Sequence, residues 1–214
     1  MLYSMSPHLL DLVSLIKDIV TGIVAIGGLT VAALGLQAWR RQLRGRTQYD
    51  LARRTLRATY KVRNEIQSVR HPGISSGEFK VAREEAGIEE NPQVVGSSIE
   101  DNVAVYQRRM NRLGEAWSDL ELEITEAEVL WGKEISEAVK PLRSCTISLN
   151  ASLRTYFRLM RAEERRRKVD RKRWEEADKI IYWTSDDPSE DSFTGSVSLA
   201  VEKVEEYLKP YLKI

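Results

Sequence analysis

The sequence predicts an all-α protein with one N-terminal transmembrane helix, followed by a cytoplasmic long-helix bundle that carries coiled-coil-like heptads. Two observations predict this fold class. Residues 19–39, near the N-terminus, form a run of 21 residues without a charged side chain. In the rest of the chain, apolar residues recur at steps of three and four, as on one face of a helix, and no run alternates as a β-strand does.

Residues 19–39 (IVTGIVAIGGLTVAALGLQAW) are long enough to span a bilayer, because a helical rise of about 1.5 Å per residue gives a length close to the hydrocarbon thickness of about 30 Å. A cleaved signal peptide would begin with positive charge, whereas Asp11, Lys17 and Asp18 precede this run. A core helix of a soluble protein would be shorter and would keep a polar face. We therefore expect a transmembrane helix.

The charges beside this span predict its orientation. Four arginines follow it closely, namely Arg40, Arg41, Arg44 and Arg46. The positive-inside rule then places residues 40–214 in the cytoplasm and leaves residues 1–18 as a short extracytoplasmic tail or interfacial turn. We expect the four arginines to contact lipid headgroups, with Trp39 as an aromatic anchor at the same level.

Small residues mark one face of the span. Gly28, Ala32 and Gly35 recur at helical spacing, which would let two transmembrane helices approach closely. Glycine is also frequent in transmembrane helices in general. The three residues are a candidate transmembrane contact face, and the sequence leaves both interpretations open.

The composition favours no catalytic, cofactor or metal site. The single cysteine, Cys145, cannot form an intramolecular disulfide, and it falls in an apolar helical pattern that predicts a buried side chain rather than a nucleophile. The two histidines, His8 and His71, have no Cys or His at metal-ligand spacing. We therefore expect a protein that is not an enzyme and that needs no cofactor or metal.

Charge is divided between two neighbouring segments. Residues 40–72 hold ten Lys/Arg and two Asp/Glu, whereas residues 78–137 hold six Lys/Arg and fifteen Asp/Glu. This division predicts that a basic helix packs beside an acidic one, a pairing that sets register more than stability. Alternatively, each segment faces a separate external partner.

The first helix is expected to begin at Pro7, after a Ser6 N-cap, and to continue out of the membrane. The sequence His71-Pro72-Gly73 should end it. Residues 71–98 then form a loop that includes one short helix over about 79–86.

Two long helices with apolar stripes follow. The first has four heptads of a and d positions over residues 103–131, and Ser97 is its expected N-cap. The second has its stripe over residues 135–159, where Pro141 predicts a kink or a restart near Lys140. Helices over about 170–183 and 196–211 complete the bundle, with an acidic loop at 184–195 between them.

Residues 161–173 (RAEERRRKVDRKR) form a basic segment with eight cations and three anions. The cations are Arg161, Arg165, Arg166, Arg167, Lys168, Arg171, Lys172 and Arg173. They could bind nucleic acid phosphates, anionic lipid or an acidic protein. Alternatively, they are solvated helix ends, where cations favour the C-terminal dipole. The distance of this segment from the membrane depends on the path of the loop at 71–98, which the sequence leaves open.

Short motifs resemble one group of known proteins. They are residues 39–43 (WRRQL), 52–54 (ARR) and 69–72 (VRHP), together with Gly45 and Tyr49. This pattern resembles an uncharacterised group of bacterial single-pass membrane proteins with a cytoplasmic helical domain. The resemblance implies a location in the bacterial inner (cytoplasmic) membrane, and it implies no activity.

These observations predict a membrane-anchored helical scaffold, sensor or accessory subunit. We expect it to act through helix–helix contacts with a partner protein or as a homo-oligomer. The alternative is a membrane-tethered module that recruits nucleic acid or an acidic partner through residues 161–173. Membrane lipid is an expected partner in both cases.

Overall fold

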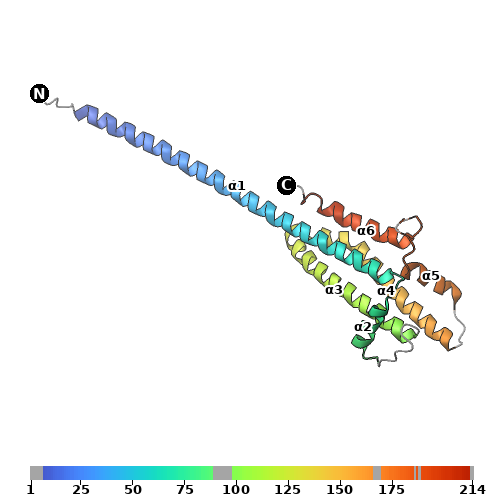
Figure 1. Cartoon of the computed structure of the whole chain (residues 1–214). Coiled ribbons are helices and arrows are strands. Elements are labelled where there is room, and N and C mark those ends of the chain that lie inside the picture. The colour runs from blue at the N-terminus through green and yellow to red at the C-terminus, as the bar shows by residue number, and fades with distance from the viewer. Residues whose placement is uncertain (1–6, 89–97, 166–169, 186, 188, 213–214) are drawn as a thin grey trace. The chain divides into compact units, whose positions relative to one another are not determined.

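The computed structural model describes residues 7–88, 98–165, 170–185, 187 and 189–212, and it is all-α in these residues (Figure 1). Its helices are α1 (Pro7–Arg70), α2 (Ser76–Ala86), α3 (Ile99–Trp131), α4 (Glu134–Glu164), α5 (Arg171–Ile181) and α6 (Ser192–Leu208). The chain divides into two units, Met1–Thr47 and Gln48–Ile214, which are described in turn.

The first unit contains the N-terminal part of α1. Among the described residues, this is the one helix that is long and apolar enough, by length and composition, to cross a membrane. None of its most apolar window is buried, and Leu29 and Val31 are each 71% exposed. The hydroxyls of Thr21 and Thr30 donate to the backbone oxygens four residues earlier, so these polar groups are satisfied within the helix.

The second unit is a helical bundle around one main core. The last part of α1 contributes to this core together with α3, α4, α5 and α6. Its fully buried side chains include Leu51, Val62 and Ile66 of α1, Leu113 and Leu120 of α3, Leu142 and Leu149 of α4, Ile181 of α5 and Leu208 of α6. Helix α2 packs instead on α3 through a small second cluster of Ala82, Ala104 and Val105.

The apolar stripe predicted for α3 faces the core. Tyr106, Leu113, Trp117, Leu120, Ile124 and Ala127 are buried. Met110 and Val103, towards the N-terminal end of the stripe, are half-buried. The observed N-cap is Ser98, whose hydroxyl accepts from the backbone N–H of Asp101 at 3.0 Å, whereas the predicted cap, Ser97, lies outside the described residues.

The helix does not restart near Lys140, because α4 continues through Pro141 without a break. A proline in a helix cannot donate a hydrogen bond to the carbonyl four residues earlier, here that of Glu137. Glu137 is exposed, so water can satisfy its carbonyl oxygen. The stripe of α4 also differs from the predicted one, since Val139 and Leu153 are buried and Cys145 is half-buried.

The start predicted for the last helix is also wrong. Helix α6 begins at Ser192 rather than near residue 196, so part of the predicted acidic loop is helical. The reason is Asp191, whose carboxylate accepts from the backbone N–H of Thr194 at 2.9 Å and so forms the N-cap. Helix α5 lies within its predicted range, with Asp170 as its N-cap.

Ion pairs confirm that a basic part of α1 lies beside an acidic part of α3. Arg54 pairs with Glu126 at 2.7 Å, and Lys61 pairs with Asp119 at 2.6 Å. Both pairs are about half exposed, and exposed pairs add little stability. Their contribution is therefore to the register between the two helices.

A buried ion pair joins the ends of three helices. Arg70, the last residue of α1, is 1% exposed, and its guanidinium lies 2.9 Å from the carboxylate of Asp191. It also donates to the backbone oxygens of Ile180 at 2.7 Å and Tyr182 at 2.9 Å, near the end of α5. One side chain thus satisfies carbonyls at the end of α5 and holds the residue that caps α6.

A second buried arginine fixes the loop that follows α1. Arg109 of α3 is 3% exposed and binds both carboxylate oxygens of Glu78, at 2.7 and 2.8 Å. It also donates to the backbone oxygens of His71 at 2.7 Å and Gly73 at 2.9 Å. This contact positions α2 and the preceding loop against α3.

We predict that Arg70→Met lowers the free energy of unfolding by about 3–5 kcal/mol, because the carboxylate of Asp191 stays buried without its cation. The measurement is thermal unfolding of the full chain in detergent micelles, followed by tryptophan fluorescence. The matched control is Arg57→Met, since Arg57 lies exposed on the same helix. Its effect should stay within about 0.5 kcal/mol. Equal shifts for both variants would contradict the role of Arg70.

The same pair predicts a pH dependence. Burial acts to raise the pKa of Asp191, but hydrogen bonds from the backbone N–H groups of Thr194 and Thr184 and the charge of Arg70 outweigh it, so this pKa lies below its ordinary value. A carboxyl with a depressed folded-state pKa stabilises the fold above its unfolded pKa of about 4, and this contribution is lost as the pH falls through the folded value.

We therefore expect the melting curves of the wild type and Asp191→Asn to differ by a constant amount above about pH 5 and to converge at lower pH. Thermal unfolding between pH 7 and pH 2 measures this difference. A gap that stays constant or widens below pH 3 would show that the charge of Asp191 contributes nothing.

Candidate binding groove between α3 and α4

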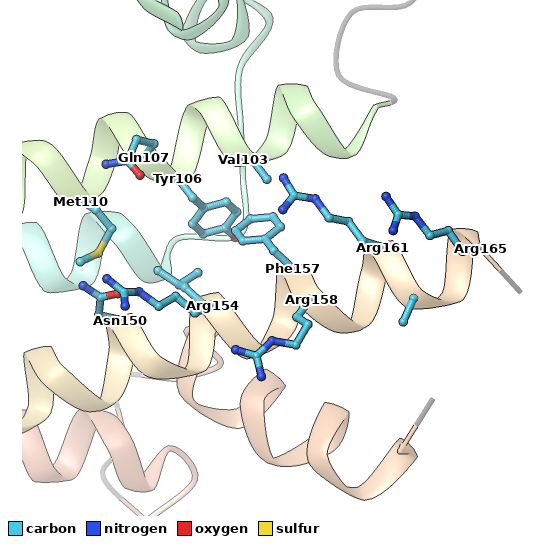
Figure 2. A pocket seen from close by; sticks show the side chains of 12 residues that line it. Val103, Tyr106, Gln107, Met110, Asn150, Arg154, Phe157, Arg158, Arg161 and Arg165 are labelled. Atoms are coloured by element: carbon cyan, nitrogen blue, oxygen red, sulfur yellow. The ribbon is translucent and has the colours of Figure 1, made fainter. Parts of the chain in front are cut away.

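A groove lies where the start of α3 faces the end of α4 (Figure 2). Its volume is about 620 Å³, within the usual range for ligand-binding pockets. Helix α3 contributes Val103, Tyr106, Gln107 and Met110. Helix α4 contributes Asn150, Leu153, Arg154, Phe157, Arg158, Arg161 and Ala162, and Arg165 follows directly after its end. No acidic residue is among the described residues that line it.

Aromatic side chains form the floor of the groove, and contacts with neighbouring aromatic residues fix their positions. The rings of Tyr106 and Phe157 meet edge to face, with centroids 5.5 Å apart. The rings of Phe157 and Tyr156 also meet edge to face, with centroids 5.6 Å apart. The hydroxyl of Tyr156 lies 2.8 Å from that of Tyr182, the residue that follows α5. Burial raises the pKa of Tyr106 and of Tyr156, so both hydroxyls stay protonated and the floor stays uncharged.

A row of arginines lies along the groove. Arg154, Arg158, Arg161 and Arg165 follow each other at steps of four, three and four residues, so they share one face of α4. Figure 2 shows Arg161 and Arg165 extended towards α3, and Arg158 directed away from it. All four side chains are exposed.

These four arginines form no ion pair with any carboxylate in the described part of the chain. The arginines of α2, of α3 and of the first half of α4 differ from them. Each of those has a carboxylate partner, namely Arg83, Arg108, Arg109, Arg112 and Arg143. The groove therefore concentrates positive charge that the described fold leaves uncompensated.

A second hollow extends the groove past α3 towards α2. It has a volume of about 310 Å³ and shares Val103, Gln107 and Arg161 with the first. Its other walls include Ala82 and Glu85 of α2 and Glu100 and Ala104 of α3, so this hollow, unlike the first, contains carboxylates. The two hollows together form one continuous surface that crosses α3 near its start.

The structure separates the cations of the predicted basic segment 161–173. Arg161 and Arg165 line the groove near the end of α4, where the helix dipole favours cations. Arg171, Lys172 and Arg173 form the first turn of α5, where the dipole disfavours them, and only Arg173 has an ion pair in the described chain, with Asp170 at 3.4 Å. Arg166, Arg167 and Lys168 lie outside the described residues.

The residues predicted to contact lipid all lie on α1 in the first unit and are exposed, namely Trp39, Arg40, Arg41, Arg44 and Arg46. Gly28, Ala32 and Gly35 are exposed on the same helix. A Cβ added to Gly28 or Gly35 would meet nothing within 4 Å, so the described chain leaves this face open.

Two other chemical candidates have no supporting geometry in the described residues. Burial raises the pKa of the Cys145 thiol, which disfavours the nucleophilic thiolate. Among the described residues, no group of three or more His, Cys, Asp or Glu side chains could hold a metal ion.

Arg154 and Arg158 lie outside the run of cations predicted at residues 161–173, because the arginines of the groove share one helix face rather than a continuous stretch of sequence. The sequence predicts Tyr106 as part of the core stripe and does not single out Phe157. The sequence signal for the groove is the spacing of the arginines on one face of α4. The structure adds that the apolar residues beside them are only half-buried.

We predict that the groove arginines are dispensable for folding, unlike Arg109. Arg158→Gln with Arg161→Gln should leave the melting temperature of the full chain unchanged or slightly raised, because like charges on one helix face cost about 0.2–0.5 kcal/mol per pair. Arg109→Gln should cost about 3–5 kcal/mol, since it leaves Glu78 without its cation. Thermal unfolding in micelles compares them. A double variant as unstable as Arg109→Gln would make the groove arginines structural.

Comparison of this chain with models of protein families, with curated proteins and with solved structures finds no match. Its function must therefore be inferred from the residues and the geometry described above.

Proposed function

We propose that this protein is a membrane-anchored helical scaffold or accessory subunit, which holds a partner protein in the groove between α3 and α4. The observation that carries the proposal is the pairing of an uncharged aromatic floor with a row of arginines that have no carboxylate partner in the described chain. Apolar contact area and a few fixed polar groups are the usual components of a protein-binding site.

The membrane anchor in this proposal is the apolar part of α1. An unburied apolar helix is costly in water, and residues 20–36 have large apolar side chains that are 47–71% exposed. The cationic cluster from Arg40 to Arg46 at one end supports a location of the bundle in the cytoplasm, at the inner membrane of a bacterium. In this arrangement, the heptads of α3 and α4 act in coiled-coil-like contacts.

The alternative function is recruitment of nucleic acid or an acidic partner through residues 161–173. The observation that favours it is the exposed first turn of α5, where Arg171 and Lys172 lie at the disfavoured end of the helix dipole. Phosphates near this turn would compensate both the side chains and the dipole. Against it, Arg161 and Arg165 line the groove rather than join this turn.

Photo-crosslinking of the full chain in its native cells tests the proposal. We place the photoreactive residue benzoylphenylalanine at Gln107, which is exposed at the edge of the groove. We expect one discrete protein adduct, because the bound partner lies within reach of this position. The adduct should be lost when Arg154, Arg158 and Arg161 are changed to Glu, since reversed charges repel the same partner.

The matched control places the same photoreactive residue at Ser118, which is exposed on α3 outside the groove. It should give no such adduct. The proposal is wrong if Gln107 yields no adduct, or if the same adduct forms from Ser118 or survives charge reversal.

A further inference from the structure

We propose that the occupant of the groove is an acidic amphipathic helix of about four turns, contributed by the partner protein. This inference rests on the proposed function and specifies the chemistry of its ligand. The length of the groove, the continuation of the helical stripes in its floor and the sign of its charge all favour such a helix.

The length of the groove fits a helix. Its walls on α4 extend from Asn150 to Arg165, which is about 22 Å at the rise of an α-helix. That distance is about four helical turns. A four-turn helix would therefore be contacted along its whole length by α4, and along about half of it by α3, whose wall extends about 10 Å from Val103 to Met110.

The floor continues the stripes that pack the bundle. Val103 and Met110 have heptad positions on α3 equivalent to those of Trp117 and Ile124, yet they are half-buried where the latter are buried. Phe157 is likewise half-buried on α4. A third helix with an apolar stripe would cover these side chains in the same way as the bundle's own helices cover the rest of the stripe.

The charge of the groove selects an acidic helix. Arg154, Arg161 and Arg165 recur at helical spacing on α4, so carboxylates on one face of the partner helix would face them. Arg158 adds positive charge at the edge of the groove, although its side chain is directed away from α3. Arginine also binds carboxylates through two parallel hydrogen bonds. A basic helix would meet uncompensated like charge, and an uncharged helix would leave the arginines without partners.

The test is a peptide-display selection on the full chain in phosphatidylcholine nanodiscs. The library holds 20-residue peptides with helix-favouring residues and randomised polar positions. The baits are the wild type and the variant Arg154→Gln with Arg158→Gln and Arg161→Gln. We expect the wild type to enrich peptides that combine an apolar stripe with Asp or Glu at steps of three and four.

The binding of selected peptides is then measured by fluorescence anisotropy. Their affinity should fall about tenfold on the triple variant, as expected from the loss of three partly exposed ion pairs. Raised salt should weaken binding to the wild type, since these pairs are screened. A third bait with Arg158→Glu and Arg161→Glu should enrich Lys- and Arg-rich peptides instead, because the sign of the charge in the groove is reversed.

Three results would overturn the inference. Enriched peptides without an acidic bias, alongside a groove-dependent adduct at Gln107, would refute the acidic helix while the docking function stands. A single-stranded oligonucleotide that binds the wild type more tightly than any selected peptide, and loses this affinity on the triple variant, would make the groove a nucleic acid site. Absence of both peptides and adduct would refute the proposed function as well.

Discussion

The contact between Arg70 and Asp191 determines how the bundle is assembled. A helix end leaves backbone groups without partners, and three helix ends meet at this point. The guanidinium of Arg70 donates hydrogen bonds to backbone carbonyls near the end of α5. It also binds the carboxylate of Asp191, which caps α6. A buried ion pair adds little net stability compared with apolar packing, but breaking it leaves a charge without compensation. We infer that this pair sets where α5 and α6 pack.

The same contact supports the groove indirectly. Arg70 holds the backbone of Tyr182, whose hydroxyl contacts that of Tyr156, and Tyr156 packs against Phe157 in the groove floor. The floor is thus connected to the core by a short series of contacts, while the arginines above it contribute nothing to that core. Packed aromatic residues in the floor, and arginines that have no carboxylate partner among the described residues, give the surface shape and charge before any partner binds. This lowers the cost of ordering the surface on binding.

The sequence predicts more of the fold than of the groove. Periodicity at three and four residues is sufficient to predict the helix over residues 103–131, because apolar residues recur along it without a gap. Pro141 does not end α4, since a proline within a helix removes only one backbone hydrogen bond and the carbonyl left free belongs to the exposed Glu137. The role of Arg70 could not be predicted, because its partner Asp191 is distant in sequence. The position of the groove could not be predicted, because it depends on which face of α4 the other helices leave uncovered. The packing of the helices determines that face, and the composition of α4 does not.

Cysteine accessibility tests the central claim, that a partner occupies the groove, most directly. With Cys145 changed to Ala, a single cysteine replaces Gln107, and its rate of reaction with a maleimide is compared between native membranes and the purified full chain. We predict slower labelling in native membranes, and equal rates once Arg158 and Arg161 are changed to Glu. Equal rates in the chain with its arginines intact would contradict the claim.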